Sequence, residues 1–78
     1  MSTDVEDLDQ ARRQLGLSHY HLWMRSLGLG GTSDAHATRN HLTGRDPLPD
    51  GDHDHLVTAL NEAFLDTGDR RRLPYRRT

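Results

Sequence analysis

Apolar residues recur at helical spacing in four segments of the chain, and turn-forming or capping residues separate these segments. In the first, about residues 4–15, Leu8, Ala11 and Leu15 fall on one helical face. Acidic residues crowd its first turn, where the helix dipole favours them, and Gly16 follows as a stop. The pattern predicts a short amphipathic helix at the N-terminal end.

The second segment, about residues 19–27, follows Ser18, a good N-capping residue, and ends before a glycine-rich turn. Its main apolar stripe consists of Tyr20, Trp23, Met24 and Leu27. Leu22 points roughly opposite at 100° per residue, and Leu29 lies just past the end. We therefore expect Trp23 in the core and Leu22 on a second face that contacts a partner.

The third segment, about residues 34–43, has a poor apolar face, and Ser33 or Thr32 is expected to cap it. The fourth, about residues 53–67, has the clearest pattern, made by Leu56, Leu60, Ala63 and Phe64. Either Asp52 or Asp54 is expected to cap this helix.

The four segments predict an all-α fold, a compact bundle of three to four short helices around Trp23, Leu27, Leu56, Leu60 and Phe64. Two β-branched aliphatic residues in the whole chain are too few for a sheet. We expect a helical domain over residues 1–68 and an Arg-rich tail over 69–78, disordered or extended, with almost no apolar surface to bury.

Composition narrows the function classes. The 78 residues include no Cys, which removes disulfides, thiolate metal sites and Cys nucleophiles. No apolar run approaches the ~20 residues that span a bilayer, and the N-terminal segment is acidic, unlike a signal peptide. No catalytic motif or nucleotide-binding glycine pattern is present. We expect a cytoplasmic protein that is not an enzyme and needs no cofactor.

Six histidines are unusual in a chain of this length, and two of them lie in the acidic stretch Asp50–His55. His53 and His55 are two residues apart, so a helix would point them to different sides, unlike the usual metal pairs. A calcium loop that began at Asp50 would need glycine at its sixth position and glutamate at its twelfth, where this chain has His55 and Asn61. Surface histidines are the preferred interpretation, and a metal- or pH-responsive module is the second alternative.

Binding to nucleic acid is the first alternative function. The third segment carries Thr38, Arg39, Asn40 and His41, which can reach base edges, and the tail could contact phosphates. The linker of about six residues before this segment is longer than a usual helix–turn–helix turn. The net charge of −2 also argues against nucleic acid.

The preferred function is a non-catalytic regulatory or adaptor domain that acts by contact with another protein or with a second copy of itself. Leu22, Arg25 and Leu29 are the candidate binding residues on the second segment. In the tail, apolar residues lie between arginines, a pattern suited to an acidic groove, and the candidates there are Arg70, Arg71, Arg72, Leu73 and Tyr75.

Three stretches resemble small helical proteins of high-G+C Gram-positive bacteria. They are LSHYHLWMRSLGLGG (Leu17–Gly31), HDHLVTALNEAF (His53–Phe64) and the Pro74–Tyr75 pair in the tail. The resemblance covers about residues 15–75 and implies a role in transcriptional or signalling regulation. It assigns no functional residue.

Overall fold

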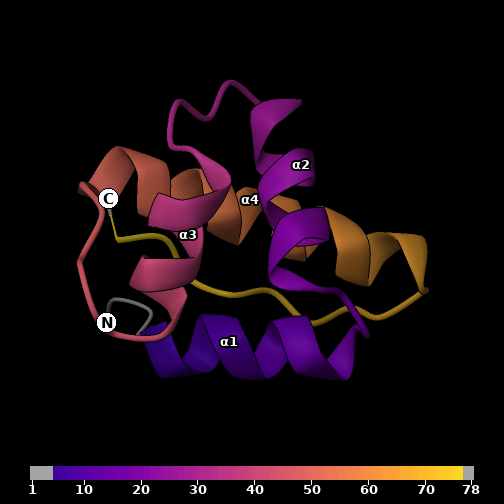
Figure 1. The fold of residues 1–78 in the computed structure, drawn as a ribbon. Helices are drawn as coiled ribbons and strands as arrows, with labels where there is room; N and C mark the ends of the chain where they lie inside the picture. Colours follow the sequence, from indigo (N-terminus) through magenta and orange to yellow (C-terminus); the bar gives the residue numbers. More distant parts are fainter. Residues whose placement is uncertain (1–4, 77–78) are drawn as a thin grey trace.

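The computed structural model describes residues 5–76, and these form four helices with no strand among them (Figure 1). The helices are α1 (Val5–Gln14), α2 (His19–Leu27), α3 (Ala35–Leu42) and α4 (Asp50–Asp66). The predicted all-α bundle with an extended C-terminal tail is confirmed. The expectations that involve Asp4 and residues 77–78 lie outside the described residues.

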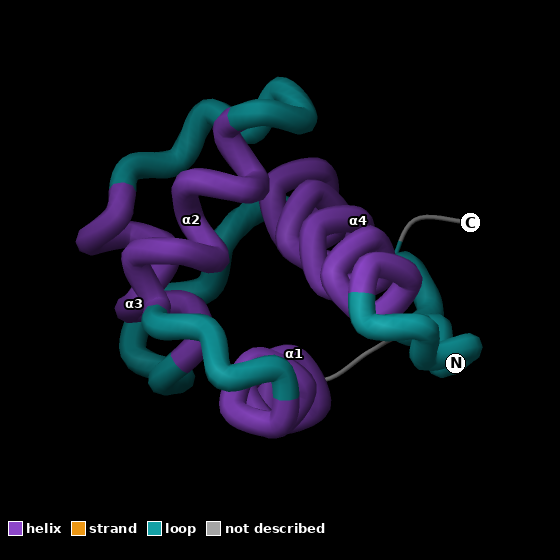
Figure 2. The backbone as a smooth tube through the Cα atoms, turned by 90° about the vertical axis from the view of Figure 1, so that its right-hand side faces the viewer, coloured by secondary structure: helices purple, strands orange, loops and turns teal. Residues whose placement is uncertain are grey.

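The longest helix, α4, carries most of the core. Helix α1 packs against α3 and α4, and α2 packs against the same two helices (Figure 2). Of the ten buried apolar residues in the described part of the chain, α4 supplies six, namely Leu56, Val57, Ala59, Leu60, Ala63 and Phe64. Each of the helices α2 and α3 buries one apolar residue fully, Leu22 and Leu42.

Side-chain caps fix where α2 and α3 begin. Ser18 accepts a hydrogen bond from the backbone N–H of His21 at 3.0 Å, as predicted for an N-cap. Asp34 accepts one from the N–H of Ala37 at 2.7 Å, so the prediction of Ser33 or Thr32 at this position is wrong. An aspartate is an equally good cap, and each cap satisfies a backbone N–H in the first turn of its helix.

Helix α4 begins at Asp50, three residues earlier than the pattern of apolar residues indicated. Pro49 occupies the N-cap position, and neither Asp52 nor Asp54 caps the helix. Asp50 and Asp52 lie in the first turn, where their negative charge is stabilised by the helix dipole. The acidic stretch is therefore part of the helix and not a loop.

The C-terminal segment runs back along α4 in the opposite direction (Figure 1). Asn61 binds the backbone of Leu73 twice, accepting from its N–H at 2.7 Å and donating to its carbonyl oxygen at 3.1 Å. Leu73 packs against the core, and the N–H of Arg76 donates to Asp54 at 2.7 Å. We expected a tail with almost no apolar surface to bury, whereas Leu73 is partly buried against the core.

We predict that Asn61→Ala lowers the free energy of unfolding by about 1–3 kcal/mol, because it leaves both backbone groups of Leu73 without their partner. Glu62→Ala is the matched control, since Glu62 is the exposed neighbour on the same helix. Urea unfolding measures both. Equal stability of the two variants would show that the contact between α4 and the tail contributes nothing.

Candidate functional site

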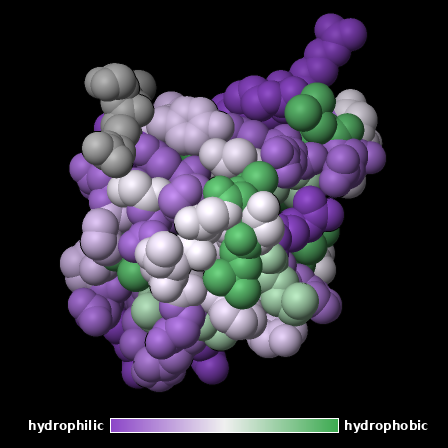
Figure 3. Space-filling view, turned by 90° about the horizontal axis from the view of Figure 1, so that it is seen from above, coloured by the Kyte–Doolittle hydropathy of each residue, from purple (hydrophilic) through white to green (hydrophobic). Residues whose placement is uncertain are grey.

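One face of α2 exposes large apolar side chains. Tyr20, Met24 and Leu27 are 55%, 49% and 42% exposed, and their spacing of four and three residues places them on one side of the helix. The surface above α2 and its following loop shows hydrophobic atoms between polar ones (Figure 3). We call Tyr20, Met24 and Leu27 the α2 face.

From the sequence we expected the side of α2 that carries Leu22 to be exposed, but this side is buried. Leu22 is fully buried and Ser26 is 5% exposed, so the prediction that Leu22 lies at the surface is wrong. The linker after α2 folds back onto this side, where the N–H of Gly31 donates to the carbonyl oxygen of Ser26 at 2.9 Å. A Cβ atom at Gly31 would lie 2.9 Å from that oxygen, so this approach requires glycine. Leu29 is also partly buried against the core.

Trp23 lies between the α2 face and the linker and is half-buried, not fully buried in the core as predicted. Its indole N–H donates to the carbonyl oxygen of Ser33 at 2.7 Å, and its ring lies 5.4 Å from that of Tyr20. Both contacts hold the indole in one orientation beside the α2 face. Leu27, which was expected in the core, is exposed.

Two shallow hollows border α2 and α3, and they share His36 and Arg39. One, of about 380 Å³, is lined by Ser18, His19, Tyr20, Ala35, His36 and Arg39. The other, of about 430 Å³, is lined by His36, Arg39, Asn40, Thr43 and Arg45. These described lining residues include arginines and histidines but no Asp or Glu, so the hollows favour negatively charged groups.

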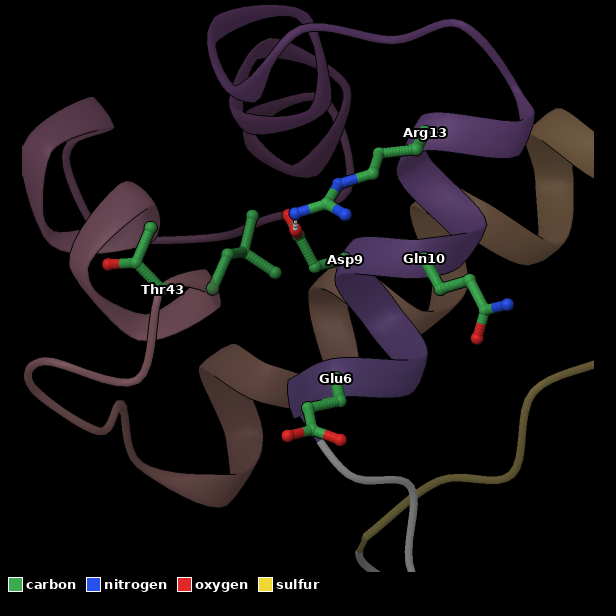
Figure 4. A pocket seen from close by; sticks show the side chains of 6 residues that line it. Glu6, Asp9, Gln10, Arg13 and Thr43 are labelled. Carbon is green, nitrogen blue, oxygen red and sulfur yellow. Dashed lines mark ion pairs between the residues drawn. The ribbon is translucent and has the colours of Figure 1, made fainter.

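A third hollow, of about 570 Å³, lies between α1 and α3 (Figure 4). Its buried carboxylate, Asp9, contacts Arg12 at 2.8 Å, Arg13 at 2.9 Å and His19 at 3.3 Å. Burial raises the pKa of Asp9, but the hydrogen bonds and positive charges of its partners outweigh this effect and lower the pKa. Asp9 is therefore negatively charged and links α1 to the start of α2. Because it stays deprotonated, it is unsuited to act as a general acid.

Two of the four residues expected to reach nucleic-acid bases are inaccessible. Thr38 is 1% exposed and His41 is fully buried, because they form the inner side of α3. Arg39 is exposed and Asn40 half-buried. The predicted recognition surface on α3 is therefore wrong for Thr38 and His41.

His41 makes a buried contact with His53 of α4. The backbone N–H of Leu48 donates to His41 Nδ1 at 2.9 Å, so the proton of the neutral ring is on Nε2, which donates to His53 Nδ1 at 2.8 Å. Desolvation, the charge of His53 and that of Arg76 lower the pKa of His41 to about 4. The pKa of His41 is thus well below the usual value of 6.5 for histidine, and the surface position expected for the histidines is wrong for His41 and His53, which are fully buried.

The acidic stretch at the start of α4 does not assemble a metal site. Among residues 5–76 no group of three or more His, Cys, Asp and Glu side chains is placed to hold a metal ion. Helical geometry separates the side chains, and each takes another partner. Asp52 accepts from Thr32, Asp54 from the N–H of Arg76, and Asp50 pairs with the Arg76 guanidinium at 3.7 Å.

The predicted binding residues of the tail lie along α1 and α4, away from the α2 face. Arg71 stacks over the Phe64 ring at 5.0 Å, hydrogen-bonds to Gln14 and pairs with Asp69. Arg72 donates to two backbone carbonyl oxygens of the tail, and Arg70 is exposed. The tail arginines therefore act partly within the fold.

The remaining candidates also have partners within the protein. The Tyr75 hydroxyl accepts a hydrogen bond from Thr58 at 3.1 Å, although the residue is 42% exposed. Arg25, at the end of α2, pairs with Asp66 of α4 at 3.4 Å. The structure therefore does not bring the predicted residues together into one surface.

The chain matches no protein-family model, no curated protein and no solved structure.

We predict that Leu22→Ala destabilises the protein by about 2–5 kcal/mol, because it leaves a cavity beneath α2. Met24→Ala, on the exposed side of the same helix, should change the stability by only about 0.5 kcal/mol. Thermal and urea unfolding check both variants. A larger effect at Met24 would mean that the α2 face is the packed side.

We predict that acidification destabilises the fold through His41. Below pH 6.5 the unfolded chain protonates this residue, whereas the folded chain excludes the proton until about pH 4. The free energy of unfolding should fall as the pH drops through this window, by about 3 kcal/mol in total. Urea unfolding at several pH values measures the slope.

The control for His41 is an exposed histidine on the same helix. His36→Gln should retain the full pH slope, whereas His41→Gln, which cannot titrate, should flatten it. If both variants keep the slope of the wild type, another group is responsible.

Proposed function

We propose that the protein is a non-catalytic regulatory or adaptor domain that binds another protein through the α2 face. The observation that supports this is the outward orientation of Tyr20, Met24 and Leu27 in a chain with only 32% hydrophobic residues. The same chain buries His41, His53, Thr38 and Asn61. Large apolar side chains grouped at the surface of so polar a protein are typical of binding surfaces.

The residue types of the α2 face suit a protein partner. Tyrosine, tryptophan and methionine are enriched at protein interfaces, because they provide large contact areas. Burying the exposed part of Tyr20, Met24 and Leu27 contributes roughly 25 cal/mol for each Å² of apolar surface. Trp23, held by Ser33, borders the face and supplies a rigid edge.

The α2 face is fixed before a partner arrives. Ser18 caps the helix, Leu22 anchors its inner side, and the Arg25–Asp66 ion pair ties its end to α4. A surface that is already ordered loses less conformational entropy on binding, which favours affinity.

The proposed setting is regulatory and cytoplasmic, in line with the resemblance of Leu17–Gly31 and His53–Phe64 to small helical proteins of high-G+C Gram-positive bacteria. Within residues 5–76, no helix has the length and apolar character that crossing a membrane requires.

We predict that Met24→Glu abolishes partner capture without unfolding the protein, because it places a charge in the middle of the α2 face. Gln10→Glu is the matched control, since it adds the same charge at an exposed position of α1. Wild-type and variant proteins are immobilised, exposed to nuclease-treated native lysate and compared by quantitative mass spectrometry. Circular dichroism confirms that each bait is folded.

The expected result is a protein captured by the wild type and by Gln10→Glu and absent with Met24→Glu. If the partner is a second copy of the chain, sedimentation of the purified wild type should show self-association, and Met24→Glu should abolish it. Identical captured proteins and identical sedimentation for all three baits would overturn the proposal.

A further inference from the structure

We propose that the α2 face and the two adjoining hollows bind an acidic, amphipathic segment of the partner protein. Its apolar side chains would pack on Tyr20 and Met24, and its carboxylates would bind Arg39 and Arg45. This inference rests on the proposed function and adds the chemistry of the partner.

The apolar and cationic parts of this surface are continuous at Tyr20. The Tyr20 side chain belongs to the α2 face and also lines the hollow that contains His36 and Arg39. His36 and Arg39 in turn line the second hollow, which ends at Arg45. A single extended or helical segment could therefore contact apolar groups along α2 and cationic groups along α3.

The guanidinium groups of Arg39 and Arg45 are available. Neither forms an ion pair with another residue in the described part of the chain, and both residues are exposed. Five other arginines pair with aspartates, namely Arg12, Arg13, Arg25, Arg71 and Arg76, and Arg70 and Arg72, which form no ion pair with a described residue either, belong to the tail and line neither hollow. A guanidinium binds carboxylates through paired hydrogen bonds, so the two unpaired arginines at the hollows define the charge of the ligand.

Two acidic residues flank α3, and neither lines the hollows. Asp34 is engaged as the N-cap of α3 through its hydrogen bond to Ala37. Asp46 follows Arg45 and lies on the exposed loop. His19, which does line a hollow, is in contact with Asp9 at 3.3 Å. No described carboxylate pairs with Arg39 or Arg45, so both guanidinium groups are open to the carboxylates of a ligand.

A protein segment fits these observations better than nucleic acid. The exposed part of α3 offers Arg39 and half-buried Asn40, since Thr38 and His41 point into the core. The apolar α2 face, which joins the cationic hollow at Tyr20, would find few apolar groups along the sugar–phosphate backbone of a duplex. The net charge of −2 also opposes long-range attraction to a polyanion.

A second copy of this chain is a less suitable occupant. Its exposed apolar residue next to acidic ones is Leu65 of α4, beside Glu62 and Asp66. This surface of α4 offers one apolar side chain, and its Asp66 is already paired with Arg25.

The test uses three synthetic peptides of about 14 residues, each roughly 20 Å long as a helix. All carry leucines at helical spacing, and the other positions combine alanine with Glu, Gln or Lys. Binding to the full chain is followed by the fluorescence of Trp23, the only tryptophan, and by calorimetry. The expected result is binding of the Glu peptide that weakens with salt, with at least tenfold weaker binding of the Gln and Lys peptides.

Variants locate the site. Arg39→Gln with Arg45→Gln should weaken the Glu peptide at least tenfold, and Met24→Gln should weaken it as well. Arg70→Gln with Arg72→Gln removes the same charge from the tail and should leave binding unchanged. Circular dichroism verifies that all variants remain folded.

Four results would overturn the inference. They are no binding of the Glu peptide, equal binding of the Glu and Gln peptides, displacement of the Glu peptide by a DNA duplex of about 20 base pairs, and self-association that depends on Arg39, Arg45 and Leu65. The lysate capture experiment with Met24→Glu tests the proposed function independently of the peptide experiments. A partner lost with Met24→Glu but retained when Arg39 and Arg45 are replaced would preserve the proposed function and refute the acidic partner.

Discussion

A shortage of apolar side chains governs this fold. The ten buried apolar residues come mainly from α4, which contributes six, so the other helices are stable only when packed against it. Helices as short as α2 and α3 would not persist alone in water. The tail follows the same principle, since Leu73 adds to the core where α1 and α4 leave room.

Directional polar contacts fix the packing of the short elements where apolar contacts are few. The hydrogen bonds from Leu48 to His41 and from His41 to His53 join α3, its following loop and α4. Asn61 joins α4 to the tail in the same way, through both backbone groups of Leu73. Because a buried polar group without its partner is costly, these contacts specify one arrangement of the short elements. They also make the packing of α3 sensitive to protonation.

Local patterns were enough to predict the four helices and the Ser18 cap, because spacing and capping act over a few residues. They were not enough to decide which side of α2 is buried. Four apolar residues on one side outnumbered Leu22, yet α2 packs on α3 and α4 through the side of Leu22, and the linker covers Ser26 on the same side. The contacts His41–His53 and Asn61–Leu73 join residues twelve positions apart, and no periodicity indicates such pairs.

The same shortage supports the proposal that the outward side of α2 is a binding surface, because a chain with few apolar residues exposes three large ones there. Helix α2 packs on α3 and α4 with Leu22 fully buried between them, and its cap and the Arg25–Asp66 pair hold its two ends. A partner that covers Tyr20 and Met24 would bind the folded form alone, so binding and folding would be linked. A bound partner would then stabilise the folded form, and protonation of His41 at low pH would weaken folding and binding together. The inner side of α2 thus contributes to stability, and the recognition that we propose would use its outer side.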